Sequence, residues 1–117
     1  MKYLTALLLV LLPAQILSAA KWYKGNTHVH TKLCGHADST PEVVAGWYHD
    51  RDYNFLILSE HNKFIDPATV KLKGKVRKDF ILIPGEEVTG RKTIHSTAMN
   101  IDRLVPWHYD HKDRSGI

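Results

Sequence analysis

Two histidines separated by one residue, His28 and His30, carry the clearest chemical signal in this chain. Residues two apart on a strand point to the same face, so both imidazoles are expected to lie side by side. Neutral imidazole is a favoured ligand of zinc, iron and related metals. The pair alone is a weak signal, but later segments with histidine or carboxylate residues strengthen it: CGHAD (34–38), LILSEHN (56–62), IPGEEVTG (83–90) and IHSTAMNI (94–101).

Short strands that alternate with helices would position these segments. Composition and periodicity predict strands at 27–31, 55–58, 80–83 and 94–101 and helices at 41–52 and 66–78. Each helix would begin at a capping residue followed by proline. This order predicts parallel pairing through crossover helices. His61 and Glu87 then follow the second and third strands, where α/β barrels gather their functional groups.

The first 20 residues have the features of a secretory signal peptide. Lys2 precedes an apolar run from Leu4 to Leu12, and small residues at Ser18 and Ala20 suit cleavage after Ala20. The run is shorter than the roughly 20 apolar residues of a membrane span, and an uncleaved anchor is the alternative. We expect a secreted or periplasmic protein without stable membrane insertion after cleavage.

The composition of the chain limits which classes of partner and substrate are expected. The net charge is +4 with neutral histidines, which suits an anionic substrate. The densest basic stretch, at 71–78, has no interleaved aromatic residues, so a nucleic-acid groove is not expected. Cys34 is the single cysteine and cannot form an internal disulfide, so a bound metal ion is the plausible cross-link that would stabilise so small a fold. It would be a small buried thiol or, alternatively, a soft metal ligand.

Three segments resemble the polymerase-and-histidinol-phosphatase (PHP) superfamily of metal-dependent hydrolases: WYKGNTHVHT (22–31), PEVVAGWYHDRDYNFLILSEHN (41–62) and PGEEVTG (84–90). They are similar to the exported branch that includes carbaryl hydrolase, whereas CGHAD is closer to the histidinol-phosphatase-like first loop. The resemblance covers nearly all of residues 22–104. It implies a distorted (β/α)7 barrel, an α/β fold, that holds two or three ions of zinc, manganese or iron.

By this resemblance, histidine and glutamate side chains would supply the metal ligands: His28, His30, His36, His61, Glu87 and His95. Glu87 would bridge one ion at the H-x-H pair to a second ion at His95, and the two remaining histidines would serve a third. The family completes these shells with later residues that do not match here. We therefore expect the N-terminal portion of a barrel at 21–104, from a fragment or a truncated gene product, and an unpatterned tail at 105–117.

Each proposed ligand has an ordinary alternative. The H-x-H pair could be a polar strand pair, His61 a loop residue that caps the next turn through Asn62, and His95 a strand-surface residue. Asp38 is the alternative to His36. Glu86 faces away from Glu87 on an extended chain and would be exposed to solvent or lie behind the ligands.

Other polar residues could support the site. Glu60 could orient His61 or another imidazole, or could be a simple exposed carboxylate. Arg91, with Lys92, could meet an anionic substrate or form a charged turn. The tail group His108, Asp110 and His111 has a chelating spacing but does not match the family's C-terminal motif.

These residues predict an exported metal-dependent hydrolase, of phosphoesters, that uses metal-bound hydroxide and no side-chain nucleophile. The substrate would be a small-molecule ester or another anionic compound. The alternatives are a carbamate- or amide-bond hydrolase of the carbaryl-hydrolase type, a catalytically incomplete metal-binding fragment and a basic surface-binding module. Similar ligand sets serve different bonds, so the residues do not select one substrate.

Overall fold

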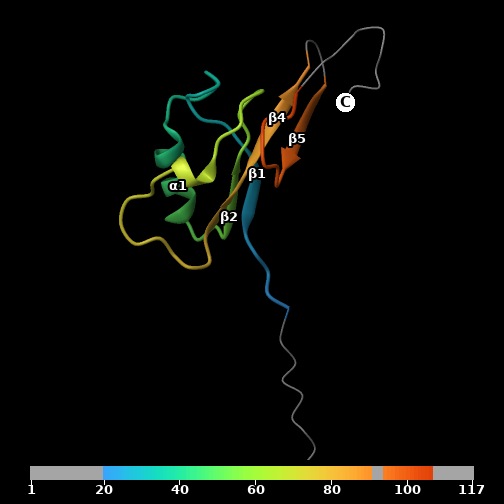
Figure 1. The fold of residues 1–117 in the computed structure, drawn as a ribbon. Coiled ribbons are helices and arrows are strands. Elements are labelled where there is room, and N and C mark those ends of the chain that lie inside the picture. The colour runs from blue at the N-terminus through green and yellow to red at the C-terminus, as the bar shows by residue number, and fades with distance from the viewer. Residues whose placement is uncertain (1–19, 91–93, 107–117) are drawn as a thin grey trace, which may run out of the picture.

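The structure is a computed structural model that describes residues 20–90 and 94–106. Its elements follow in the order β1 (Gly25–Val29), α1 (Pro41–His49), β2 (Phe55–Leu58), the 3-10 helix η1 (Pro67–Thr69), β3 (Ile81–Ile83), β4 (Gly85–Thr89) and β5 (His95–Met99). Strands β1, β2 and β3 form a parallel sheet in that order, while β4 and β5 pair antiparallel. Helix α1 lies on one side of β2 and the β4–β5 hairpin on the other (Figure 1).

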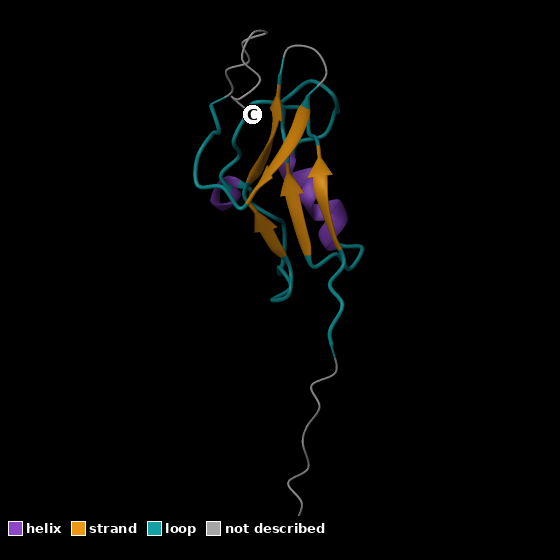
Figure 2. Cartoon of the chain, turned by 90° about the vertical axis from the view of Figure 1, so that its right-hand side faces the viewer, coloured by secondary structure: helices purple, strands orange, loops and turns teal. Residues whose placement is uncertain are grey.

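The core fills the space between the parallel sheet and α1. Side chains alternate along β2, so Leu56 and Leu58 pack with Ala45 of the helix in one buried cluster. Thr40 caps the helix, because its side chain accepts a hydrogen bond from the Val43 N–H. The helix lies behind the strands in Figure 2, on a single face of the sheet. This packing fixes the carboxyl ends of β1 and β2.

The hairpin covers part of the opposite face of the sheet. Gly85 lies against Ile57 so closely that a Cβ atom there would be 2.4 Å from Ile57 Cγ2 and 2.7 Å from the Ala98 carbonyl oxygen. The Glu87 N–H donates to the Glu60 carbonyl, and the Asn62 N–H donates to the Glu87 carbonyl. These bonds extend β2 alongside β4, and they bring His61 next to Glu87.

Several predicted elements are found close to their expected positions. The predicted strand at 55–58 matches β2, and the helix predicted at 41–52 is α1 with a shorter C-terminal end. The strands predicted at 27–31 and 80–83 correspond to β1 and β3. Their parallel pairing is confirmed, since β1 and β3 both run parallel to β2.

The predicted helix at 66–78 is wrong. Asp66 caps only the three-residue η1, and the chain is already extended at Val70. Gly74 adopts a left-handed backbone conformation with φ of +77°, which an α-helix does not accommodate. Lys71 and Lys75, four residues apart, would also lie side by side on a helix and repel each other. The connection to β3 is therefore made without a long crossover helix.

The chain after β3 also differs from expectation. Pro84 and Gly85 were expected to stop β3, but β4 begins directly at Gly85, where no strand was predicted, and the predicted strand at 94–101 is β5. The two strands form an antiparallel hairpin rather than continuing the parallel order. Glu87 therefore lies within a strand, and its direction is set by strand alternation.

Among residues 20–90 and 94–106, no helix is both long and apolar enough to cross a membrane. The predicted signal peptide lies almost entirely in residues 1–19, outside the described part of the chain. Arg91 and Lys92, and the tail group at 108–111, also lie outside it.

Candidate metal centre

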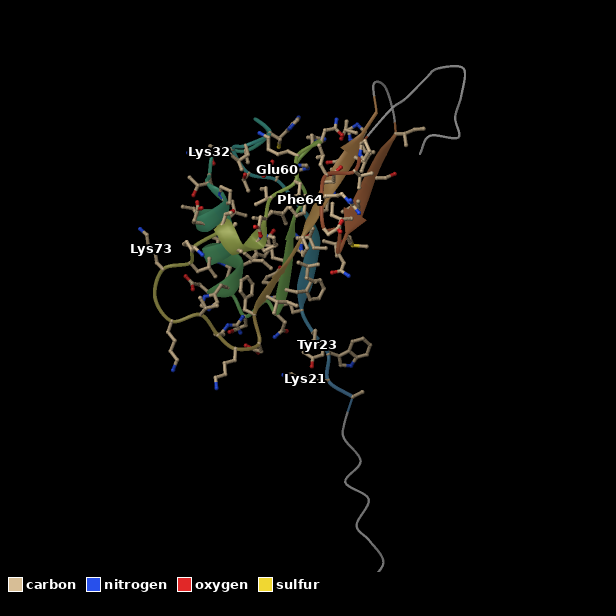
Figure 3. All side chains as sticks on the ribbon, in the orientation of Figure 1. Lys21, Tyr23, Lys32, Glu60, Phe64 and Lys73 are labelled. Atoms are coloured by element: carbon tan, nitrogen blue, oxygen red, sulfur yellow. The ribbon has the colours of Figure 1, made fainter. Side chains whose placement is uncertain are left out.

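The ends of several strands bring the predicted ligands into one cluster. His28 belongs to β1 and His30 follows it, while His61 lies just beyond β2. The hairpin supplies Glu87 from β4 and His95 from β5. Figure 3 shows this end of the molecule around the labelled Glu60, opposite the end that carries Lys21 and Tyr23.

Glu87 is the centre of the cluster. Its Oε2 lies 3.2 Å from Nε2 of His30, 3.3 Å from Nδ1 of His61 and 3.5 Å from Nε2 of His28. Its other oxygen, Oε1, lies 2.5 Å from Nδ1 of His95. One carboxylate therefore faces the imidazole rings of both the parallel sheet and the hairpin.

Burial makes this arrangement costly without a cation. Glu87 is only 3% exposed, and Oε2 forms no hydrogen bond with any group in the described residues. A buried anionic oxygen needs a positive charge or a donor nearby. The surrounding imidazoles can meet that need by taking up protons or by holding a metal ion together with the carboxylate.

His36 joins the cluster from the loop between β1 and α1. Its ring centroid lies 4.5 Å from that of His61 and 5.8 Å from that of His30. Asp38, the alternative ligand, is exposed and accepts a hydrogen bond from the Ser39 hydroxyl. Neither His36 nor Asp38 belongs to the potential metal-binding groups found among the described residues. The ring of His36 lies beside those of His30 and His61, so the choice of His36 over Asp38 stays a prediction that rests on this proximity.

Two threonines that the sequence interpretation missed contact the histidine rings. Thr97 Oγ1 lies 3.0 Å from Nδ1 of His28, and Thr89 Oγ1 lies 2.6 Å from Nδ1 of His61. In the hairpin register, Thr97 is opposite Glu87, and Thr89 follows Glu87 by two positions. All three share one face of the hairpin; strand alternation from Glu87 could have suggested the face of Thr89, whereas Thr97 requires the hairpin register.

Glu86 lies on the other face of β4. It is fully buried, and its Oε2 accepts a hydrogen bond from the Val105 N–H, so the predicted solvent exposure is wrong. Burial raises the pKa of its carboxyl group. Glu86 therefore ties the segment after β5 to the hairpin, while Glu87 faces the histidines.

Glu60 is also fully buried, which excludes the exposed-carboxylate alternative. Its Oε1 accepts a hydrogen bond from the Thr31 N–H, which fixes the chain just after His30. It belongs to a group with His30 and Cys34 whose potential ligand atoms all lie within 4.8 Å of one another. The remaining predicted role is to orient His61 or another imidazole. The geometry places Glu60 beside His30, and no hydrogen bond joins Glu60 to His61 within the described residues.

The charge state of His30 suits metal binding. Burial, followed by the neighbouring His61, lowers the pKa of His30 below its usual value. The ring is therefore neutral at neutral pH and offers a lone pair. The same burial effect, followed by the Glu60 carboxylate, raises the pKa of the Cys34 thiol.

Two groups around Glu87 have the composition of metal sites: His28 with His30 and Glu87, and His61 with Glu87 and His95. In each group the ligand atoms lie within 4.8 Å of one another. Imidazole and carboxylate suit zinc, manganese and iron, and a carboxylate with two oxygens can bridge two ions. The residues present thus fit the two ions that the PHP resemblance places at Glu87, while no potential metal-binding group among the described residues contains His36 for the third.

Comparisons of the chain with models of known protein families, with curated proteins and with solved structures find no match.

Proposed function

We propose that this chain carries the metal centre of a metal-dependent hydrolase of the PHP type that acts on phosphoesters. The observation that carries the proposal is the buried Glu87 carboxylate, one oxygen of which faces three imidazoles of the parallel-sheet side while the other faces His95 of the hairpin. This is the arrangement that a bridging carboxylate requires. The motifs around His28, His61 and Glu87 and the net charge of +4 support the assignment.

The protein supplies position and charge in this proposal. His28 and His30 face one carboxylate oxygen of Glu87, and His95 faces the other. Thr97 and Thr89 fix the ring orientations of His28 and His61. When bound, the metal lowers the pKa of a coordinated water to about 7, so a side-chain nucleophile is not needed.

An assay with a chromogenic phosphomonoester and a phosphodiester tests the proposal. The protein is stripped with a chelator and then supplied with Mn²⁺ or Zn²⁺. We expect hydrolysis only after metal is restored, and we expect Glu87→Gln to lose it. The matched control is Glu86→Gln, the same change at the neighbouring residue, which faces away from the histidines.

Two outcomes contradict the phosphoesterase proposal. We call the cluster of Glu87 with its surrounding histidines the Glu87 centre. Hydrolysis that persists in chelator, or in the Glu87→Gln variant, shows that this centre is not the source of the activity. Metal that binds without any phosphoester hydrolysis leaves a metal-binding protein or a different substrate class. A carbamate ester in the same assay then distinguishes these two, because only the carbaryl-hydrolase-type alternative cleaves it.

We further propose that the protein is exported. The charged start at Lys2, the apolar run and the small residues before Lys21 support this proposal. The mature protein recovered from the expressing cells is expected to begin at Lys21. N-terminal sequencing that finds Met1 retained on the exported protein contradicts cleavage at this position.

A further inference from the structure

A second cluster of potential ligands lies beside the Glu87 centre. It consists of Cys34, His30 and Glu60, and we call it the thiol cluster. One ligand atom from each residue lies within 4.8 Å of the other two. Cys34 and Glu60 supply no ligand to the proposed hydrolytic centre, so the thiol cluster requires its own explanation.

His30 faces the two clusters with different ring nitrogens. Its Nε2 lies 3.2 Å from Glu87 Oε2, while its Nδ1 lies 3.5 Å from the Cys34 sulfur. The loop after β1 brings the thiol to this position. A backbone turn from Lys32 to Gly35 and the 3.6 Å contact of Cys34 Sγ with the Thr31 carbonyl hold the loop in place.

Glu60 contributes an independent sign of a missing ligand. It is 0% exposed, and its Oε1 is satisfied by the Thr31 N–H at 2.8 Å. Its Oε2 is buried and meets the geometry of a hydrogen bond with no group in residues 20–90 and 94–106, and the Cys34 thiol is the polar group that interacts with this carboxylate. An isolated buried carboxylate oxygen is costly, and a cation beside it removes that cost.

We propose that Cys34, His30 and Glu60 form a binding site for a thiophilic divalent cation such as Zn²⁺ or Cd²⁺. Thiolate, imidazole and carboxylate are together a suitable ligand set for a tetrahedral zinc ion with one further position open. A bound cation displaces the thiol proton to solvent. The carboxylate oxygen that lacks a partner then becomes a ligand.

The shared histidine couples the thiol cluster to the Glu87 centre. A neutral imidazole has one lone pair, so an ion at Nδ1 leaves Nε2 protonated unless the ring loses its second proton. A thiophilic ion at Cys34 therefore competes for the His30 lone pair that faces Glu87. The thiol cluster can bind its ion whether or not the proposed hydrolase activity exists.

Titration of the full 117-residue chain with Co²⁺ tests the proposal directly. Only a thiolate ligand gives the near-ultraviolet sulfur-to-cobalt charge-transfer band, and Cys34 is the single cysteine. We expect the band to reach a constant intensity as Co²⁺ is added, allowing for ions bound at Glu87, and to be absent in Cys34→Ser. Glu60→Gln, which preserves shape, should lower the affinity by about 10-fold or more.

Glu87→Gln is the control that separates the two sites. The band should persist in this variant, because Glu87 contacts the other nitrogen of His30. If the band is lost in Glu87→Gln while circular dichroism shows an intact fold, the thiol cluster is not a separate site. Absence of the band in the wild-type protein also overturns the proposal. An unchanged Co²⁺ affinity in Glu60→Gln overturns it too, because it indicates adventitious binding to the thiol alone.

A measurement on the wild-type chain covers the case in which Glu60→Gln does not fold. Zn²⁺ in several-fold excess over the chain, enough to fill the groups at Glu87 as well, should slow alkylation of Cys34 by iodoacetamide by about 10-fold or more, because a coordinated thiolate is a weaker nucleophile. An unchanged alkylation rate overturns the proposal.

Discussion

The parallel sheet and the β4–β5 hairpin supply the same centre but are held in place differently. The sheet packs against α1 through a core that includes Leu56 and Leu58. The hairpin is held by backbone hydrogen bonds to the end of β2 and by the contact of Gly85 with Ile57, and its Met99 is 53% exposed. The sheet therefore provides most of the stability, whereas the hairpin provides the carboxylate and depends on a few contacts for its position.

Gly85→Val is expected to have the largest effect on this arrangement. The new side chain would overlap Ile57 and the backbone of Ala98, neither of which can move without separating the hairpin from the sheet. We expect a loss of about 3 kcal/mol in the free energy of unfolding, measured by urea denaturation. Metal binding should fall as well.

Gly46→Ala is the control for this prediction. Gly46 lies in α1, and a Cβ atom there would have no neighbour within 4 Å in the structure. Alanine should stabilise the helix by about 0.5–1 kcal/mol and leave metal binding unchanged. Equal destabilisation by both substitutions would contradict the special role of the Gly85 contact.

Asn62→Ala is expected to weaken the hairpin specifically. The Asn62 side chain donates to the Thr89 carbonyl and accepts from the Thr89 N–H, so the substitution removes two hydrogen bonds between the end of β2 and β4. We expect a loss of about 2 kcal/mol of stability together with weaker metal binding.

Thr40→Ala separates overall stability from the position of the hairpin. Loss of the α1 cap should cost about 1 kcal/mol, and metal affinity should stay unchanged because α1 and the hairpin lie on opposite sides of β2 (Figure 1). Denaturation and calorimetric metal titration are carried out on both Thr40→Ala and Asn62→Ala. Unchanged metal affinity in Asn62→Ala would show that the hairpin does not depend on this contact.

Thr97→Val tests the contact between the hairpin and His28. Valine keeps the shape but removes the hydroxyl that lies 3.0 Å from His28 Nδ1. Because such contacts orient a ligand ring, we expect a decrease of about 10-fold in metal affinity, with little change in stability. Ser96→Ala is the matched control, since Ser96 is exposed and lies on the opposite face of β5. An equal decrease in both variants contradicts the role of Thr97.

Glu86 gives the smallest expected effect, a change in the pH dependence of stability. Its folded-state pKa is raised by burial above the value of 4.5, so in the interval above 4.5 the folded protein holds a proton that the unfolded chain has lost. The free energy of unfolding therefore decreases as pH rises through this interval. Glu86→Gln should flatten that slope, measured by denaturation between about pH 4 and about pH 7. An unchanged slope would show that Glu86 does not bind the extra proton.

The sequence alone predicted the structural features that depend on the local pattern of residues. The alternation of strand residues placed His28 and His30 on the same face, and the apolar run of Phe55–Leu58 identified β2. The capping residue and proline located the beginning of α1. These features depend on neighbouring residues, which is why the sequence alone could define them.

Features that depend on distant pairing were missed. The contacts of Thr97 and Thr89 and the burial of Glu86 follow from the hairpin register and from the return of the chain at Val105. The segment at 66–78 shows the reverse: Asp66 caps only a 3-10 turn, and the left-handed Gly74 prevents the helix that this local start signal predicts. The PHP family and the barrel stay predictions drawn from the motifs.

The central claim is that Glu87, and not its neighbour, holds the metal centre together. Calorimetric titration of Zn²⁺ or Mn²⁺ into the chelator-stripped chain, with Glu87→Gln and Glu86→Gln measured in parallel, tests it most directly. The account predicts a loss of about 100-fold or more in affinity for Glu87→Gln, since even contacts behind a ligand are worth 10–100-fold, and little change for Glu86→Gln. Equal affinities in the two variants would contradict it.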